Sequence, residues 1–145
     1  MLTFKKGDVL SSSAKTFVVP IYASGDLGVN AAVLLGERYR SIADDCRKAC
    51  LNGSLHPGRL MLFRALEKDV LVLPREESDW ESFLKVLSKG LDSIKRNKWR
   101  FQRNEKGVAV IAFPFSTDTD IEGTKEVFKE RFGDESSIEV EIWTV

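Results

Sequence analysis

The sequence predicts an α/β protein with a mixed or parallel central sheet that helices cover on both faces. Short apolar runs rich in β-branched residues alternate with longer stretches whose apolar residues recur at helical spacing. Strands that alternate with helices in this way build sheets with helices packed on them. The 145 residues suit a single sizeable core, and no repeat or low-complexity linker divides them. We therefore expect one domain over residues 1–145.

Six apolar runs have the length and composition of strands. They are Leu2–Lys5, Phe17–Ile21, Leu60–Phe63, Val70–Leu73, Val108–Phe113 and Ile138–Val145. The run Val108–Phe113 is the most strand-like, and its unbroken apolar character predicts a central position in the sheet. We expect Pro74 and Pro114 to close the strands that precede them, since proline restricts the residue before it.

Four stretches between these strands are expected to be helical. They run from the glycine turn after Ile21 to about Arg40, from Ser41 to Asn52, from Ser78 or Asp79 to near Asn97, and from Thr124 to Phe132. Ser41 is a favourable N-cap, and Asn52-Gly53 a favourable stop. The third stretch places six apolar residues at helical spacing between Trp80 and Ile94, which predicts a face packed on the sheet.

The stretch Val18–Leu35 suggests a ligand site. An apolar strand leads into a turn that contains Gly25 and Gly28, and an apolar helix follows. Such a turn points free backbone N–H groups at one spot, which suits a phosphate or carboxylate, although an ordinary strand-to-helix connection has the same pattern. In open α/β sheets the ligand lies at the carboxyl ends of the strands. Two loops leave strands there, 24–30 and 116–120.

Composition limits the partners of the protein. The chain carries 22 basic and 22 acidic residues, so any anion site must be local. We therefore expect neither a nucleic-acid nor a membrane partner. We also expect the protein to be a monomer. No apolar run approaches membrane-spanning length, and MLTFKKGDVL lacks an apolar signal core. The cytoplasm is the expected location.

The cysteines and the histidine predict no metal site and no cofactor. Cys46 and Cys50 lie four residues apart on an expected helix, and only His56 is near enough to join them as a ligand. A disulfide within one helical turn has poor geometry. We interpret the cysteines as two partly buried thiols, and His56 as part of a surface turn without a functional role.

The connector 98–107 interleaves basic and aromatic residues, a pattern that can bind nucleic acid. The simpler interpretation is a helix-to-strand loop whose aromatic side chains, Trp99 and Phe101, are tucked under it, and we favour that interpretation.

Several stretches, in this order, resemble the macro domain, the ADP-ribose-binding fold. They are LTFKKGDVL at the start, Leu27–Leu34, Cys50–Gly58, Val110–Pro114 and Glu141–Val145, and together they extend over nearly the whole chain. The closing strand looks like that of the compact branch that removes ADP-ribose from proteins or DNA. The resemblance implies a three-layer α/β/α fold with a mixed sheet of about six strands.

The resemblance also implies a ligand site. The family's aspartate after the first strand accepts a hydrogen bond from the adenine amino group, which implies that role for Asp8. An aromatic residue at the position of Trp143 lies near the adenine. The implied ligand-binding residues are Asp8, Val9, Gly28, Val29, Asn30, Ala31, Ser116, Thr117, Asp118, Thr119 and Trp143.

The chain departs from the family pattern at both phosphate loops. Asn30 stands where a second glycine is usual, and 116–120 contains two aspartates and no glycine. Carboxylates beside a pyrophosphate are electrostatically unfavourable. The asparagine of many members is also missing, because the aligned positions are Val19 and Tyr22.

The residues expected for catalysis are incomplete. The hydrolase branch uses a lysine after the fourth strand to form an imine, and this chain offers Arg75, which stays protonated. Asp120 is the candidate to stand in for the catalytic aspartate of the second loop, and in a hydrolase either Asp118 or Asp120 would orient water or act as general base. We therefore expect a module that binds ADP-ribose or a related adenine nucleotide without efficient catalysis, with an ADP-ribosylated protein as a further partner. The alternatives are a macro-like protein-interaction module without ligand, and an ADP-ribosyl hydrolase acting on modified protein or nucleic acid.

Overall fold

The computed structural model describes residues 2–22, 24, 35–36, 39–57, 59–65, 68–75, 80–115 and 121–144. The side chains of residues 80–82 and 121 are outside this description. In the described part of the chain, no helix is long and apolar enough to cross a membrane.

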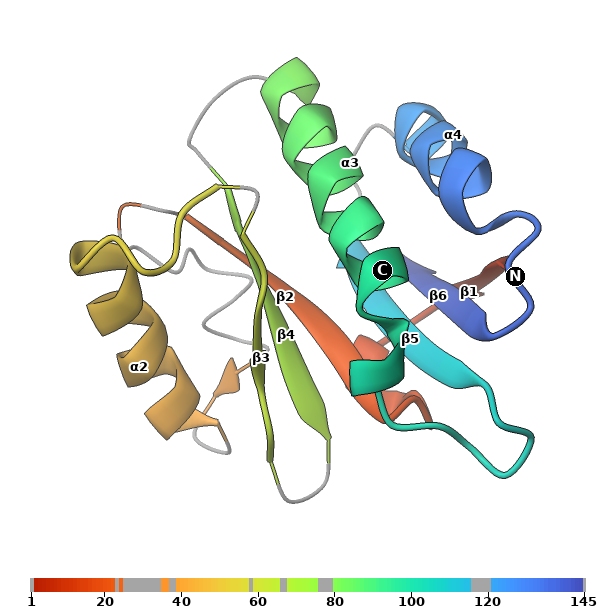
Figure 1. The fold of residues 1–145 in the computed structure, drawn as a ribbon, viewed down its shortest axis with the longest axis horizontal. Helices are drawn as coiled ribbons and strands as arrows, with labels where there is room; N and C mark the ends of the chain where they lie inside the picture. The colour runs from red at the N-terminus through yellow and green to blue at the C-terminus, as the bar shows by residue number, and fades with distance from the viewer. Residues whose placement is uncertain are drawn as a thin grey trace.

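A mixed six-stranded sheet forms the centre of the molecule, as the sequence predicts (Figure 1). Its order is β1-β6-β5-β2-β4-β3, and the strands are β1 (Leu2–Lys6), β2 (Thr16–Tyr22), β3 (Met61–Phe63), β4 (Asp69–Arg75), β5 (Ala109–Phe115) and β6 (Ile138–Thr144). Only β3 runs antiparallel to its neighbour; all other pairs are parallel. The carboxyl ends of five strands therefore lie along one edge, and β5 is central as expected.

Helices cover both faces of the sheet, so the fold has three layers. The helices are α2 (Arg40–Leu51), α3 (Trp80–Arg96) and α4 (Ile121–Phe132), with short 3₁₀ turns η1 (Val9–Ser11) and η2 (Lys98–Arg100). Alternation along the strands separates the two cores. In β2, for example, Phe17 and Val19 pack on the α2 side, whereas Val18 packs under α3.

The helix boundaries differ slightly from the expected ones. Helix α2 begins at Arg40 rather than Ser41, because the Tyr39 carbonyl accepts hydrogen bonds from the N–H groups of Ile42 and Ala43 at 3.0 and 3.1 Å. It ends at Asn52-Gly53 as predicted. Helix α4 begins at Ile121, before Thr124. Most of the helix expected before Arg40 lies outside the described residues.

The expectation that Pro74 and Pro114 close their strands was wrong. Pro74 lies inside β4, and Pro114 lies inside β5. The register explains why the missing N–H is tolerated. β3 pairs with β4 only as far as Val72, and β2 pairs with β5 only as far as Ala112. Beyond those residues each proline has a paired strand on one side only, so its ring displaces no second ladder.

The connector 98–107 also differs from expectation. Phe101 is buried at 6% exposure, as predicted, but Trp99 is 72% exposed. Phe101 packs in the core under α3, whereas the 3₁₀ turn η2 directs the indole of Trp99 outward.

Pairing between β2 and β5 is limited to Thr16 with Ile111 and Phe17 with Ala112. From there β2 continues alongside β4, and β5 continues alongside β6. After β2 the chain adds β3 and β4 on one side of it, with β3 at the edge, and then crosses to add β5 on the other side. A reversal of strand order at the carboxyl edge is where open α/β sheets bind ligands.

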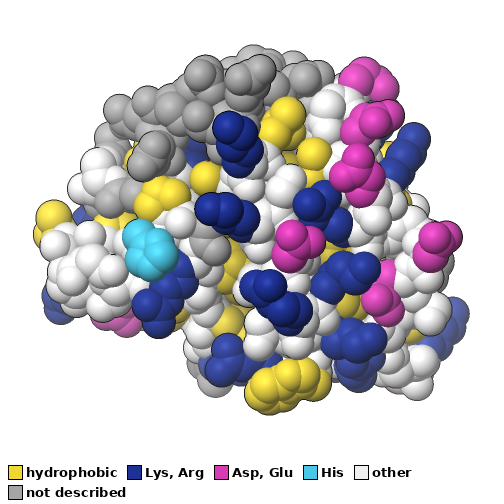
Figure 2. Space-filling model, turned by 45° about the horizontal axis from the view of Figure 1, so that its top comes forward, with side chains coloured by type: hydrophobic (Ala, Val, Ile, Leu, Met, Phe, Trp, Pro, Cys, Tyr) yellow, Lys and Arg dark blue, Asp and Glu magenta, His cyan; other side chains and the backbone are white. Residues whose placement is uncertain are grey.

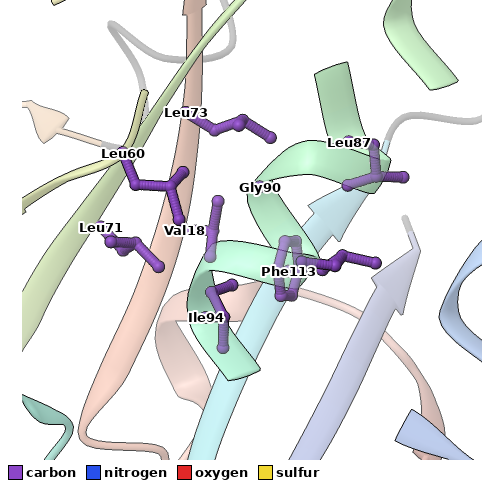
Figure 3. Close-up of a pocket in the computed structure, with 9 residues that line it drawn as sticks. Val18, Leu60, Leu71, Leu73, Leu87, Gly90, Ile94 and Phe113 are labelled. Carbon is purple, nitrogen blue, oxygen red and sulfur yellow. The ribbon is translucent and has the colours of Figure 1, made fainter. Parts of the chain in front are cut away.

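Helix α3 lies close to the sheet at Gly90. A Cβ atom at Gly90 would lie 3.0 Å from Leu73 Cδ1 and 3.6 Å from Leu60 Cδ2. The apolar gap between helix and sheet at this point, which Leu73, Leu87 and Phe113 also line, leaves no room for a water molecule (Figure 3). It is an ordinary packing contact and not a binding site.

Candidate functional site at the carboxyl edge of the sheet

Only some of the predicted site residues can be placed. Those of the two phosphate loops lie outside the described residues: Gly28, Val29, Asn30, Ala31, Ser116, Thr117, Asp118, Thr119 and Asp120. The loops themselves leave β2 after Tyr22 and β5 after Phe115, on either side of the strand-order reversal. Asp8, Val9 and Trp143 lie at the same edge, because β1 and β6 run parallel to β5 and β2.

Asp8 follows a tight turn at the end of β1. The Gly7 N–H donates to the Thr144 carbonyl at 2.8 Å, and Gly7 has a φ of 126°, which L-residues with side chains rarely adopt. Asp8 then caps η1, because its Oδ1 accepts a hydrogen bond from the Leu10 N–H at 3.0 Å. The side chain is exposed, so Oδ2 faces solvent-accessible space and can accept a hydrogen bond from a ligand.

Trp143 lies under this turn. Its Cζ3 is 3.8 Å from where a Cβ of Gly7 would be, and only 8% of its surface is exposed. The resemblance places this residue near an adenine; the burial shows a supporting position, with the indole packed beneath the Gly7-Asp8 turn. Val9 is likewise buried, at 3% exposure, so only its backbone can meet a ligand.

A buried carboxylate holds this corner together. Glu141 is 4% exposed, and its Oε1 accepts hydrogen bonds from the Ser12 hydroxyl and, at 3.0 Å, from Trp143 Nε1. Its Oε2 lies 3.3 Å from Lys5 Nζ. Glu141 of β6 thus contacts Lys5 of β1, Ser12 after η1, and Trp143.

The pKa of Glu141 is lowered. Burial acts to raise it, but the hydrogen bonds from Ser12 and Trp143, together with Lys5, outweigh burial and hold the pKa below its ordinary value. Glu141 is therefore a carboxylate at neutral pH.

The other half of the edge carries a cation. Arg75 ends β4 in register with Tyr22 at the end of β2. Its guanidinium carbon lies 4.3 Å from the centre of the Phe83 ring and 5.8 Å from that of Tyr22. Two aromatic faces thus position a permanent positive charge next to the start of the first phosphate loop.

Sequence reasoning missed Glu141. The apolar residues Ile138, Val140 and Ile142 alternate, which suggests that the residues between them face solvent. Both faces of β6 are in fact covered, since Glu141 and Trp143 share the face that η1 and Ser12 pack on. The presence of a tryptophan two residues after the glutamate was the available signal, because an indole N–H that becomes buried needs an acceptor.

The comparisons with solved structures identify the fold. The macrodomain of Thermus aquaticus DarG matches at 21% identity with a TM-score of 0.77, covering 99% of this chain and 97% of that one. The macrodomain of Mycobacterium tuberculosis DarG matches at 22% identity with a TM-score of 0.78 and the same two coverages, 99% and 97%. This chain has the macrodomain fold.

Thermosipho africanus DarTG, solved in complex with ADP-ribose, matches this macrodomain fold at 17% identity with a TM-score of 0.72, covering 99% of this chain and 42% of that one. Neither a family model nor a curated protein matches the sequence. Within the described residues of this chain, no three His, Cys, Asp or Glu side chains gather in a way that could hold a metal ion. Cys46 and Cys50 form no disulfide, and they are buried and half-buried, in keeping with two partly buried thiols.

Proposed function

We propose that this protein binds ADP-ribose, or a related adenine nucleotide, along the carboxyl edge of its sheet. The observation that carries the proposal is the pair formed by Asp8 and Val9. Asp8 Oδ2 is an open acceptor, and the Val9 N–H, as the first in η1, has no partner within that turn. An acceptor beside a donor matches the Watson–Crick edge of adenine, which offers an amino donor beside a ring-nitrogen acceptor.

The spacing of the strands favours a ligand longer than a nucleoside. Asp8 follows β1, and the strand-order reversal lies between β5 and β2, two to three strands away. Neighbouring strands are about 4.8 Å apart, so these points are roughly 10–14 Å apart. A diphosphate joining two riboses can extend that far. Thermosipho africanus DarTG, of which this chain matches 42% in fold, was solved in complex with ADP-ribose, which supports the proposal.

Under this proposal the two phosphate loops enclose the pyrophosphate, through Gly28, Val29, Asn30 and Ala31 on one side and Ser116, Thr117, Asp118 and Thr119 on the other. Arg75 offsets part of the negative charge that Asp118 and Asp120 bring to the second loop. An arginine keeps its proton and cannot form an imine with a sugar, so we propose binding without efficient hydrolysis.

The test is isothermal titration with ADP-ribose and, in parallel, AMP. Replacing the carboxylate in Asp8→Asn keeps a good cap for η1 but presents an amide that donates where the adenine amino group also donates. Loss of a charge-assisted hydrogen bond is worth about 1.5–3 kcal/mol, so we expect binding to weaken roughly 10- to 150-fold. Asp134→Asn, an exposed aspartate in the turn after α4, is the matched control and should bind as the wild type does.

The outcomes separate the alternatives. The proposal is supported if ADP-ribose binds with micromolar affinity, if its affinity is well above that of AMP, and if Asp8→Asn loses this binding. Binding that Asp8→Asn leaves unchanged would rule out the adenine position at Asp8. No binding of either nucleotide would favour the protein-interaction module, and release of ADP-ribose from a modified protein or oligonucleotide would favour the hydrolase.

A further inference from the structure

A second surface stands out on helix α3 and the turn that follows it. Between residues 85 and 100 the chain has six basic residues and a single carboxylate. The six, which we name the α3 basic stripe, are Lys85, Lys89, Lys95, Arg96, Lys98 and Arg100, and all are exposed. Figure 2 shows Lys and Arg side chains gathered in the middle of this face around one acidic side chain, with the other acidic side chains toward its right-hand side.

The arrangement follows from helical geometry. Lys85, Lys89 and Arg96 are spaced by four and seven residues, so they line the face of α3 opposite Leu87, Leu91 and Ile94, which are in the core. The one carboxylate on this face, Asp92, accepts a hydrogen bond from Arg131 of α4 at 2.9 Å, so its charge is already compensated. Of the six basic residues, Lys98 lies 3.9 Å from Glu135.

Trp99 lies at one end of the stripe. Its indole is 72% exposed, and the guanidinium carbon of Arg100 lies 5.4 Å from its ring centre. The turn is well anchored: Phe101 is buried beside it, and Arg64 Nη2 donates to the Arg100 carbonyl at 2.6 Å. A large apolar ring held outward on an anchored turn, among cations, is a platform on which another flat ring can stack.

We propose that the α3 basic stripe and Trp99 bind single-stranded nucleic acid, with phosphates along the stripe and a base stacked on Trp99. Lys85 and Arg96 are eleven positions apart on the helix, about 17 Å along its axis, which suits on the order of four nucleotides. Phosphates and stacking bases are the partners that cations beside an exposed indole favour. The balanced net charge of the chain led us to expect no nucleic-acid partner, but a net charge does not describe how the charges are distributed.

This surface is separate from the nucleotide site at Asp8. Trp99 precedes the amino end of β5, while Asp8 and Val9 lie at the carboxyl edge. The seven residues of β5 place about 20 Å between the two edges. The two sites can therefore be tested independently of each other.

The experiment is fluorescence anisotropy with labelled twelve-nucleotide oligo-dT and oligo-U that carry no ADP-ribose. We expect Trp99→Ala to weaken binding about 5- to 150-fold, the range for loss of one stacked base. The double variant Lys89→Gln/Arg96→Gln should reduce the slope of log affinity against log salt by about 1.4, or 0.7 for each lost phosphate contact. Comparing the two oligonucleotides distinguishes DNA from RNA as the source.

Two matched controls lie on α2, on the opposite face of the sheet. Leu51→Ala removes an apolar side chain that is 79% exposed, and Lys48→Gln removes an exposed cation; neither should change binding. Asp8→Asn should bind the oligonucleotides as the wild type does. Loss of ADP-ribose binding can therefore be distinguished from loss of oligonucleotide binding at the α3 basic stripe.

Three results would overturn the proposal. The first is no binding of either oligonucleotide at low salt. The second is binding that Trp99→Ala leaves unchanged, since the cations alone would then attract any polyanion. The third is displacement of the oligonucleotides by polyglutamate at equal charge concentration, which would indicate an acidic protein surface as the partner.

Discussion

Replacing Glu141 tests whether this buried carboxylate stabilises the corner of the sheet that holds Asp8. In Glu141→Gln the amide oxygen can still accept from the Ser12 hydroxyl and from Trp143 Nε1, which both donate to one oxygen in the wild type. The charge is lost, however, and the amide N–H₂ then faces Lys5. In Glu141→Ala both donors lose their acceptor inside the core.

The structure sets the size of each effect. A hydrogen bond to a charged group is worth about 1.5–3 kcal/mol and a neutral one about 0.5–1.5, so two weakened bonds cost roughly 2 kcal/mol in Glu141→Gln. Lys5 adds little, because 42% of its side chain is exposed. In Glu141→Ala, two unsatisfied buried donors cost about 1–3 kcal/mol each, or roughly 2–6 kcal/mol together.

The assay is urea unfolding followed by circular dichroism, with thermal melting in parallel. For a chain of this size about 2 kcal/mol lowers Tm by roughly 4–8 °C. Glu139→Gln is the matched control, since Glu139 lies on the same strand and face but accepts only from Thr3 Oγ1, at 2.8 Å and half-buried. Glu139→Gln should lower the free energy of unfolding by less than about 1 kcal/mol.

The pH dependence has a definite sign. Because the folded state lowers the pKa of Glu141, the carboxylate contributes stability that is fully present above the ordinary glutamate pKa and is lost as the pH falls through the folded value. The difference between wild type and Glu141→Gln should therefore be largest near pH 7 and shrink below about pH 4.3. An equal Tm for the two proteins at pH 7, or a difference that stays constant down to pH 3, would refute the reasoning.

Two further predictions concern the packing around α2 and α3. Gly90→Ala should stabilise the protein by roughly 0.5 kcal/mol. The gain in helix propensity, up to about 1 kcal/mol, should exceed the cost of shifting the Leu73 side chain by a few tenths of an ångström. A lower midpoint of urea unfolding would show that Leu73 cannot move. Cys46 should resist alkylation by iodoacetamide at pH 8 while Cys50 reacts, because burial above all, with Cys50 and Asp45, raises the pKa of Cys46 to about 12. Mass spectrometry that finds both thiols labelled at equal rates without denaturant would contradict this.

Much of the fold follows from local patterns in the sequence. Short apolar or alternating runs predicted all six strands of the described sheet, and the spacing of apolar residues in α3 predicted its buried face, because both are local consequences of burial. The prolines were misjudged because their effect depends on register. Whether Pro74 or Pro114 interrupts a ladder depends on where β3 and β2 stop pairing, which no local pattern contains.

At the candidate site, too, some residues could be found from the sequence and others could not. The role of Asp8 was inferred from the resemblance of the opening stretch to a known family, and the structure packs the preceding Gly7 on Trp143, which is 136 positions later in the chain. Glu141 was missed because its burial depends on η1 and Ser12 folding over β6, and its one local signal was Trp143 two residues later. The outward position of Trp99 was missed for a related reason: sequence alone could not say which aromatic of the connector, Trp99 or Phe101, would find space in the core.

The pairing of β1 with β6 has a consequence for how the protein is made. β1 is synthesised first, yet β6 is its strand partner, and the Gly7 N–H bonds to the Thr144 carbonyl. Until residue 144 has left the ribosome, the first strand has no neighbour on which to form a ladder, and the turn that carries Asp8 lacks its support. The turn at Gly7 and Asp8 is therefore assembled last among these elements, by closure of contacts that are distant in the chain and slow to form. A nascent chain halted before β6 would leave β1 without its strand partner and the Gly7-Asp8 turn without its hydrogen bond to Thr144.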